Sequence, residues 1–425
     1  MHDSAITLLD PKGQILFACS LERLTRIKQD GRPPSALMEG LDWSRIAGIA
    51  VSTNKELIPG EIKPSLIHPA PLPAPEAPFQ LEHDQPFHQF LDSLPAPKYY
   101  FSHHLSHLAS SYYLSGFKDA MGLIYDAGTY NDYHLGGLYH CEGNNLTAID
   151  EFRAERCAKM TLLYALVTAL AGFSPSRHEG KITGLASFGK PTKKCEAFLQ
   201  SLISDRYIET LCCFEWAYRY SADIAPIFVT PGYFINHLKE EAKAFTREEL
   251  AATVQKMAED HVIEILNNAK KQGMITSDSI CLSGGLFANV KINQRVKEWG
   301  FKNVFISPPM TDDGTSLGAA LLLCRQLGGL QAPYRVDHMF HGINSSASDT
   351  LATLKQFNVT YTQPSNPAEE IAQALHNDLS VAVVQGKCEF GPRALGNRSV
   401  LAAAKDPNIN QILNKKFHRT EFMPF

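Results

Sequence analysis

The sequence lacks paired cysteines. Its nine cysteines are scattered through 425 residues, and no two of them have the two-residue spacing of a structural zinc site. An odd number at irregular positions also argues against a framework of disulfides. We therefore predict reduced thiols that serve mostly as small core residues.

Long apolar runs and a strong charge of either sign are also missing. No stretch approaches the roughly 18 apolar residues of a membrane-spanning helix, and the opening MHDSAITLLD has no basic leader. A net charge of −4 and a pI near 6.5 disfavour nucleic acid, including tRNA, and anionic membranes as partners. We expect a cytoplasmic protein without a nucleic-acid or membrane partner.

The pattern of apolar segments predicts an α/β protein. A chain of 425 residues is too long for one compact core and favours about two or three domains. Residues 5–19 suggest a hairpin, and residues 134–153 suggest another. Strands and helices alternate from residue 279 onward, as in α/β folds, whereas residues 330–365 look irregular.

Three histidines stand at the start of a predicted helix in FSHHLSHLASSYYLSGF, residues 101–117. His103 and His107 are four residues apart, so their imidazoles project from one helix face. Such a pair can coordinate one metal ion through both imidazole rings. The alternative is that these are ordinary surface or core histidines.

Two aspartates follow predicted strands and complete a candidate ligand set. Asp126 ends the strand at 120–126, and Asp312 lies in TDDGTSLGAA between a strand and a helix. Two imidazoles and two carboxylates suit a divalent ion such as Fe²⁺, Mn²⁺ or Zn²⁺, whose open positions can hold phosphate oxygens. The alternatives are a turn residue at Asp126 and a helix cap at Asp312.

Two glycine-containing segments are candidates for ligand contact. In ICLSGGLFANVKINQRV (280–296), Gly284 and Gly285 connect a strand to a helix whose free N–H groups could bind an anion. A plain tight turn is the alternative there. In RHEGKITGLASFGKP (177–191), Glu179 and Lys181 could contact substrate from a loop, or the loop is merely solvated.

A second candidate anion site is the segment CEFGPRALGNRSVLA (388–402). Arg393 and Arg398 are five residues apart in a segment that contains glycines. A guanidinium can donate two parallel hydrogen bonds to two oxygens of a phosphate or carboxylate group. We interpret the segment as an oxyanion-binding loop, with a structural salt-bridge loop as the alternative.

Together these motifs resemble a known family, the NodU/CmcH-type carbamoyltransferases. The resemblance rests on HHLSHLA (103–109), EGKITGLASFGKP (179–191), GGLFAN (284–289), TDDGT (311–315) and EFGPRALGNRS (389–399), which occur in the family's order. HDSA (2–5) and ERLTRIKQD (22–30) match its amino-terminal motifs.

The resemblance implies a fold and a set of ligands. Residues 1–345 would form an actin/Hsp70-like (ASKHA) nucleotide-binding domain of two βα subdomains, and residues 346–425 would begin a YrdC-like α/β domain. The metal, iron first among the candidates, would be held by His103, His107, Asp126 and Asp312. The nucleotide would be contacted by Glu179, Lys181, Gly284, Gly285, Asn289 and Gly314.

The resemblance also implies a reaction. Carbamoyl phosphate and ATP, with Mg²⁺, would give carbamoyl adenylate, and the carbamoyl group would pass to a hydroxyl of a sugar, antibiotic or nodulation-factor-like metabolite. Arg393 and Arg398 would hold phosphate groups. His104 would contact substrate, and His2 is a candidate base. A hydrogenase-maturation role is disfavoured, because that family carries CxxC zinc motifs.

The chain departs from the family pattern at both ends. Met1 directly precedes His2 where the family has a strand, and the sequence stops at EFMPF (421–425). We therefore expect a chain truncated at both ends. The alternative function is a metal- and nucleotide-binding protein without complete chemistry. Residues 63–97 and 205–250 are expected to shape the acceptor pocket, while the acceptor, the metal and a homodimeric state stay open.

Overall fold

The computed structural model describes residues 3–53, 85–126, 134–153, 160–175, 177–203 and 238–418. His2, most of the segment 63–97 and residues 205–237 lie outside these ranges, so the predictions made for them concern residues that are not described. None of the helices in the described ranges combines the length and apolarity needed to cross a membrane.

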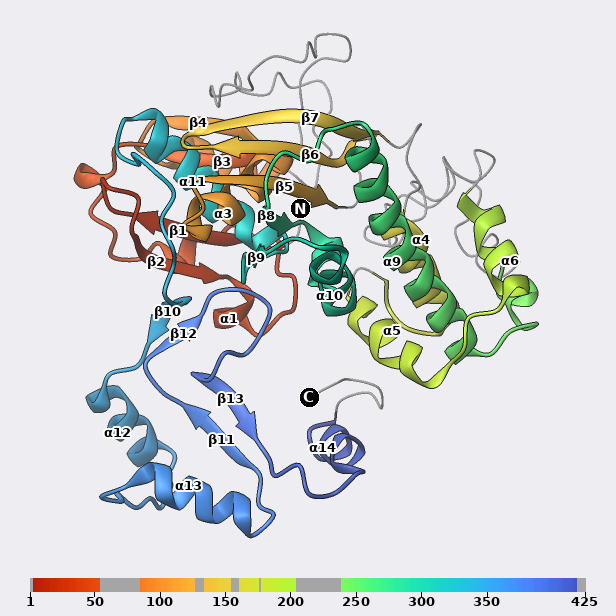
Figure 1. Cartoon of the computed structure of the whole chain (residues 1–425). Coiled ribbons are helices and arrows are strands. Elements are labelled where there is room, and N and C mark those ends of the chain that lie inside the picture. The colour runs from red at the N-terminus through yellow and green to blue at the C-terminus, as the bar shows by residue number, and fades with distance from the viewer. Residues whose placement is uncertain are drawn as a thin grey trace.

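The centre of the molecule is a five-stranded sheet with the order β7-β6-β5-β8-β9 (Figure 1). Its strands are β5 (Asp119–Tyr125), β6 (His134–Glu142), β7 (Asn145–Arg153), β8 (Ser279–Ser283) and β9 (Asn303–Ile306). Strand β6 is antiparallel to both β5 and β7, whereas β8 is parallel to both β5 and β9. The predicted α/β architecture and the hairpin at 134–153 are confirmed.

Strand β5 is buried on both faces, and its side chains alternate between two cores. Met121, Leu123 and Tyr125 pack with α4 (Met160–Leu170) and α9 (Arg247–Lys271). Ala120 and Ile124 pack with α3 (His103–Ser115) and α11 (Thr315–Gln326). A strand covered on both faces has no polar face, which explains the unbroken apolar run AMGLIY.

Two smaller strand pairs come from the amino-terminal part. The hairpin predicted for residues 5–19 is confirmed as β1 (Ala5–Leu9) and β2 (Ile15–Ser20). The Asp10 carboxylate stabilises its turn by accepting the N–H groups of Lys12 and Gln14, each at 2.8 Å. The parallel pair is β3 (Ile49–Thr53) with β4 (Lys98–Ser102), and the short helices here are α1 (Glu22–Thr25) and α2 (Gln85–Ser93).

The helices that pack in the same core as α4 and α9 include one that the sequence did not predict. The segment 177–191, expected to be a loop, forms the helix α5 (Glu179–Leu185) and a 3₁₀ turn over Ala186–Phe188. Ile182 and Leu185 are buried in the same core as α4 and α9. The two glycines of EGKITGL weaken the helical pattern in the sequence, and burial of one apolar face outweighs them. The other helices here are α6 (Lys193–Ile203) and α10 (Val290–Trp299).

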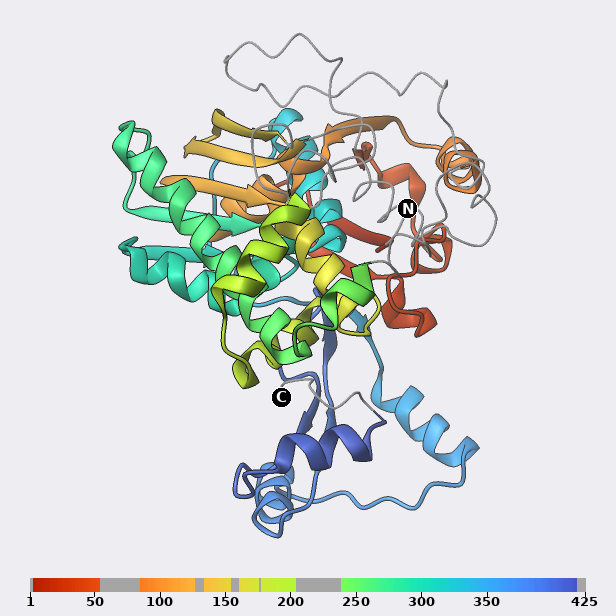
Figure 2. The same cartoon turned by 90° about the vertical axis from the view of Figure 1, so that its right-hand side faces the viewer.

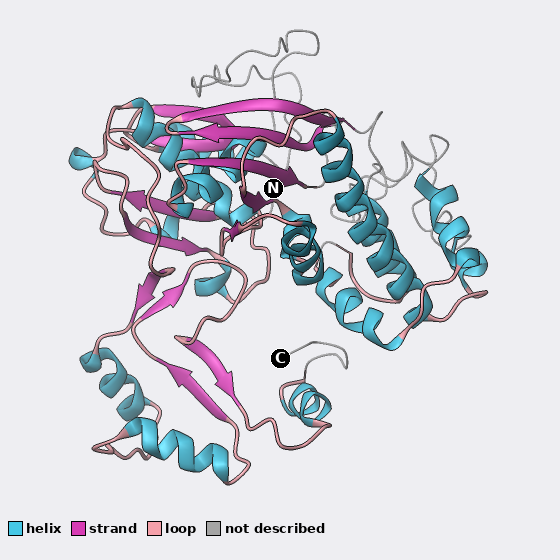
Figure 3. Cartoon of the chain, viewed as in Figure 1, coloured by secondary structure: helices cyan, strands magenta, loops and turns pink. Residues whose placement is uncertain are grey.

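Residues 340–418 form a C-terminal lobe that extends away from the central sheet (Figures 2 and 3). Strand β10 pairs with β12, and β11 pairs with β13, both antiparallel. The expectation of irregular structure over 330–365 is wrong in part, because a strand and a helix capped by Ser346 and Asp349 form there. The elements are β10 (Phe340–Asn344), α12 (Ala347–Gln356), α13 (Pro367–His376), β11 (Val381–Val384), β12 (Lys387–Glu389), β13 (Arg398–Leu401) and α14 (Ile409–Lys416).

Candidate metal centre

Helix α3 presents two histidines one turn apart at its start. The hydroxyl of Ser102 caps the helix by accepting the N–H of Leu105 at 3.4 Å. The helical spacing brings the Nε2 atoms of His103 and His107 to 3.2 Å from each other. His107 is fully buried, and 12% of the His103 side chain is exposed.

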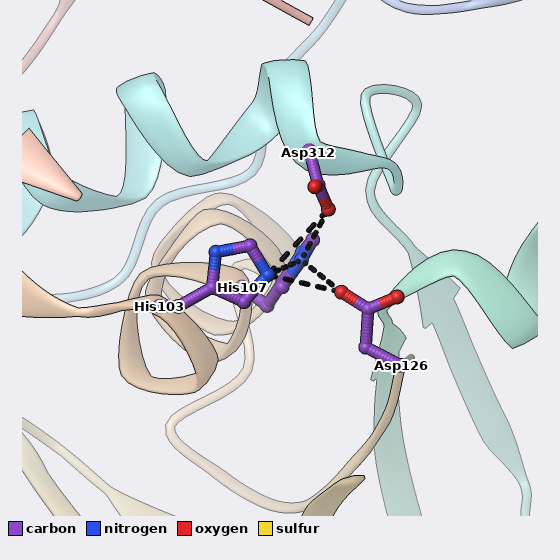
Figure 4. Close-up of side chains that lie close together, drawn as sticks. All are labelled: His103, His107, Asp126 and Asp312. Carbon is purple, nitrogen blue, oxygen red and sulfur yellow. Dashed lines mark hydrogen bonds and ion pairs between the residues drawn. The ribbon is translucent and has the colours of Figure 1, made fainter. Parts of the chain in front are cut away.

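Two aspartates from distant parts of the chain close around this pair (Figure 4). Asp126 follows the end of β5, and its Oδ2 lies 3.0 Å from Nε2 of His103 and 3.1 Å from Nε2 of His107. Asp312 begins the 3₁₀ turn Asp312–Gly314 before α11, and its Oδ1 lies 3.5 and 3.4 Å from the same two atoms. The structure therefore brings the four predicted ligands together.

The spacing of the four atoms fits a small divalent cation. The ligand atoms all lie within 4.8 Å of one another, and five of their separations fall between 3.0 and 3.5 Å. Four ligands each about 2.0 Å from a tetrahedral ion stand about 3.3 Å apart. Nitrogen and oxygen donors in this number suit Fe²⁺, Mn²⁺ or Zn²⁺. The cluster could therefore hold a metal ion.

The carboxylates also reverse the effect of burial on the histidines. Burial alone would lower the pKa of each imidazole, but the neighbouring Asp312 and Asp126 raise the pKa of His103 to about 10. The pKa of His107 is raised as well, against burial, chiefly by the same two carboxylates. Burial and Asp312 would raise the pKa of Asp126, but hydrogen bonds from both imidazoles hold it below its usual range. When no ion is bound, protons on the two imidazoles supply the positive charge that the ion would bring to the carboxylates.

A second set of contacts comes from the turn after β8. Ser283 Oγ lies 3.3 Å from Nδ1 of His107, so the Nδ1–H of the ligating tautomer can donate to it. The backbone N–H of Gly285 donates to Asp126 Oδ1 at 3.2 Å, which leaves Oδ2 facing the histidines. The SGG turn thus orients one imidazole and one carboxylate, a role that the sequence did not reveal.

The two glycines of this turn are needed for that close approach. Gly284 has a φ of +97°, and a Cβ there would lie 2.5 Å from the carbonyl oxygen of Tyr125. A Cβ at Gly285 would lie 2.9 Å from Asp126 Oδ1. Packing against the metal ligands accounts for both glycines, and the predicted nucleotide contact at these positions stays a prediction.

We expect Ser283→Ala to weaken metal binding about tenfold while leaving the fold intact. Ser283 is fully buried, and removing its hydroxyl leaves His107 without a partner at Nδ1. Loss of such an orienting contact costs about 10- to 100-fold in metal affinity. Competition of the protein with a chromophoric chelator for Zn²⁺ measures the change. Ser115→Ala, at the other end of α3 and bonded to Tyr112, is the control; equal affinities for both variants would contradict this role.

Asn289 and Gly314 are held in the protein interior. The Asn289 amide caps α10 by accepting the N–H of Lys291 at 3.1 Å, and it donates to Gln255 Oε1 at 2.8 Å. Gln255 in turn accepts the hydroxyl of Tyr164 at 2.7 Å. Through these bonds Asn289 connects α4, α9 and α10, and the ligand contact expected for it stays a prediction. A Cβ at Gly314 would lie 1.7 Å from the carbonyl of Pro309, so close packing explains that glycine.

Three further candidates lie beside, rather than within, the four-ligand cluster. His104 is buried, and its ring packs edge-on against His134 with the centroids 4.5 Å apart. Lys181 is also buried, with its Nζ 5.0 Å from the centroid of the Phe173 ring, so the solvated-loop alternative is wrong for it. Glu179 is partly exposed in the first turn of α5.

The two arginines of the C-terminal lobe have different surroundings. Arg398 donates to the carbonyl oxygens of Gln385, Asn397, Gly386 and Ile343 at 2.8 to 3.4 Å. These bonds give Arg398 a structural role, and the anion contact expected for it stays a prediction. Arg393 is exposed and makes one long contact, 3.5 Å, to the carbonyl oxygen of Ala288 in the turn after Gly285. Its guanidinium remains available for an anion.

Glu389 is a residue that the sequence analysis missed. Its side chain is fully buried, and Oε1 accepts the backbone N–H groups of Leu395, Asn397 and Arg398 at 2.8, 2.8 and 3.0 Å. Burial would raise the pKa of this carboxyl group, but the bonds from Leu395 and Arg398 lower it instead. Glu389 therefore fixes the shape of the loop that carries Arg393.

Comparisons with family models identify the chain. The model described as Carbamoyltransferase N-terminus matches residues 92–321, and the one described as Carbamoyltransferase C-terminus matches residues 372–425. The first match alone covers more than half of the chain and contains all four residues of the candidate metal centre. The chain belongs to the carbamoyltransferase family. The resemblance noted from its motifs is confirmed.

Relatives in this carbamoyltransferase family are longer than the chain. The uncharacterized protein MJ1058 of Methanocaldococcus jannaschii is 31% identical over 350 residues, which are 76% of this chain and 54% of that protein. Nodulation protein NolNO of Sinorhizobium fredii is 27% identical over 445 residues, which cover 100% of this chain and 62% of that protein. The chain thus spans a little over half the length of these two relatives.

Solved structures are similar only at a low level. Full-length HypF, in a phosphate- and nucleotide-bound form, is 17% identical with a TM-score of 0.28 over 57% of this chain and 45% of that one. The activator of a 2-hydroxyisocaproyl-CoA dehydratase from Clostridium difficile is 12% identical with a TM-score of 0.36, over 84% and 94%. Scores this low support no conclusion about fold or function.

Proposed function

We propose that this protein is an ATP-dependent O-carbamoyltransferase. Its donor is carbamoyl phosphate, its intermediate is carbamoyl adenylate, and its acceptor is a hydroxyl of a small molecule such as a sugar, an antibiotic or a nodulation-factor-like metabolite. The observation that carries the proposal is the cluster of two histidines and two aspartates in a chain of the carbamoyltransferase family. The motif order supports an ASKHA-type domain over 1–345 and a YrdC-like part over 346–425.

The balance of the reaction defines what the protein must do. Carbamoyl phosphate, water and ATP give carbamoyl adenylate, phosphate and pyrophosphate. The acceptor hydroxyl then attacks the carbamoyl carbon, AMP leaves, and the hydroxyl proton passes to a base. A carbamate carbonyl is a poor electrophile, and the adenylate supplies the better leaving group. His2 is the proposed base and lies outside the described residues.

The described residues have separate tasks in this proposal. His103, His107, Asp126 and Asp312 would hold the divalent ion, with Ser283 and Gly285 orienting two of them. Bound there, the ion would supply Lewis-acid stabilisation of negative charge on phosphate oxygens. Arg393 would bind a phosphate group, because its exposed guanidinium lies beside the turn that follows Gly285. Adenylation would use Mg²⁺ with ATP.

The test is pyrophosphate release by the purified chain with ATP, carbamoyl phosphate, Mg²⁺ and Fe²⁺. We expect release that depends on carbamoyl phosphate and falls about tenfold in Arg393→Ala, since loss of a charge-assisted contact costs about 1.5 kcal/mol or more. Arg295→Ala, on the exposed face of α10, is the matched control and should retain activity. Metal and ATP binding without any pyrophosphate would overturn the proposal for this chain and favour a binding protein without complete chemistry.

A further inference from the structure

Two cysteines that are far apart in the sequence meet between the amino-terminal hairpin and the C-terminal lobe. Cys19 lies on β2 and Cys388 on β12, with 0% and 5% of their surfaces exposed. They belong to one small apolar cluster with Leu21 and Leu37. The Cys19 thiol donates to the carbonyl oxygen of Ser20 at 3.4 Å. Each thiol shifts the pKa of the other, so the two side chains lie close together in this cluster.

The surroundings of the pair favour a thiol on one side and a thiolate on the other. Ile343 on β10 packs against the cluster. The neighbouring Cys19 thiol is the main cause that lowers the pKa of the Cys388 thiol, and the positive charges of Arg23 and Arg398 lower it further. The pKa of Cys19 is raised by Cys388 and by burial. A thiolate near cations is the reactive form of cysteine.

The packing around Cys388 is tight. Gly342 lies against Cys388, and a Cβ at that glycine would be 2.3 Å from the Cys388 sulfur. Beside the pair, the guanidinium of Arg23 donates to the carbonyl oxygen of Gly391 at 2.5 Å. Strand β10 thus packs closely against Cys388, and α1 is joined to the loop that follows Cys388.

We propose that Cys19 and Cys388 are an oxidisable dithiol, which a hydroperoxide converts into a disulfide that joins β2 to β12. The Cys388 thiolate attacks one peroxide oxygen, the O–O bond breaks, and a sulfenic acid and hydroxide form. The Cys19 sulfur then attacks the Cys388 sulfur, its proton leaves with the hydroxyl, and water departs. Two thiols lose two electrons in total, and hydrogen peroxide is reduced to two waters.

Oxidation would tie the C-terminal lobe covalently to the hairpin. Cys388 directly precedes Glu389, whose carboxylate organises the loop that carries Arg393. A bond at Cys388 would therefore limit movement of that loop relative to β2. The disulfide itself does not depend on the proposed carbamoyltransferase reaction, and its test does not require activity.

The test is peptide mapping of the intact chain after treatment with one equivalent of hydrogen peroxide. We expect a non-reduced peptide pair containing Cys19 and Cys388, a mass lower by two hydrogens, and reversal by dithiothreitol. This pair should be at least about tenfold more abundant than any other pair among the described cysteines, because only these two of them share a buried cluster in which one thiol has a lowered pKa. Cys19→Ser and Cys388→Ser should each abolish it.

Two other cysteines provide controls. Cys281→Ala removes a fully buried thiol whose pKa is raised by burial, and it should leave the cross-link unchanged. Cys324 is partly exposed and reports ordinary surface oxidation. A reduced Cys19–Cys388 pair at a peroxide dose that fully oxidises Cys324 would overturn the proposal. So would oxidation of Cys388 to sulfinic acid without a cross-link in wild-type protein that remains folded by circular dichroism.

Discussion

We expect His107→Ala to lose metal binding by more than about 100-fold. The variant removes a fully buried ligand whose Nε2 lies within 3.4 Å of the three other ligand groups, and no described neighbour replaces it. At a free-metal concentration 100 times the Kd, wild-type protein gains about 2.7 kcal/mol of stability from binding. The variant should gain almost none. Thermal unfolding with and without Zn²⁺ or Mn²⁺ measures the difference.

A matched control separates this effect from the loss of any histidine. His140→Ala removes a partly exposed histidine that is paired with Asp119 on the neighbouring strand, away from the cluster. It should retain the full metal-dependent stabilisation. Asp312→Asn removes a ligand charge without leaving a cavity, and it should behave like His107→Ala. Full stabilisation of Asp312→Asn by metal would show that the four residues do not form the binding site.

The same site should show a defined pH dependence. In the metal-free protein the pKa values of His103 and His107 are raised, so both imidazoles carry protons that a metal must displace. Metal affinity should therefore increase as the pH rises from 6.5, the ordinary imidazole value, toward the His103 pKa of about 10, and binding should release protons. Calorimetry in buffers of different ionisation enthalpy counts the protons released by wild-type protein and by Ser283→Ala.

The second large effect is expected at Glu389. Glu389→Ala removes an ionised acceptor from three backbone N–H groups and leaves those groups buried or partly buried. Hydrogen bonds to charged groups contribute about 1.5 to 3 kcal/mol each and are not additive, so we expect a loss of about 3 kcal/mol in the C-terminal lobe. Hydrogen exchange at the amides of Leu395 and Asn397 measures it directly.

Two control variants test whether the effect is specific to the carboxylate of Glu389. Glu389→Gln keeps a neutral acceptor and should lose about 1 kcal/mol. Glu298→Ala changes an exposed glutamate on α10 and should leave exchange at both amides unchanged. If Glu389→Ala exchanges at the wild-type rate, the carboxylate does not hold the loop.

Protonation of Glu389 at low pH should destabilise the C-terminal lobe, as the Glu389→Gln substitution does. The pKa of Glu389 is lower in the folded protein than its ordinary value of 4.5, so this group stabilises the fold above that value. The stabilisation is lost as the pH falls below 4.5 toward the folded pKa. Between about pH 5 and about pH 3, wild-type protein should therefore lose more protection at Leu395 than Glu389→Gln does.

The candidate metal ligands are an example of what the sequence by itself determined. His103 and His107 are brought together by the period of one helix, and Asp126 follows an apolar strand whose end can be read from composition. Local signals of this kind do not depend on the rest of the fold. Asp312 was a candidate because it lies in TDDG between a strand and a helix, and the order of the family motifs relates it to the other three residues.

The contacts around those ligands were decided only by the tertiary structure. Ser283 reaches His107 across 176 positions, and Cys19 meets Cys388 across a still longer separation, so no local pattern reports either contact. Arg393 and Arg398 look equivalent in sequence, yet strand pairing surrounds Arg398 with carbonyl oxygens and leaves Arg393 exposed. The residues of α5 look like a loop until burial against α4 and α9 selects the helix. In each case the free energy comes from desolvation and packing between distant segments, which a linear pattern does not encode.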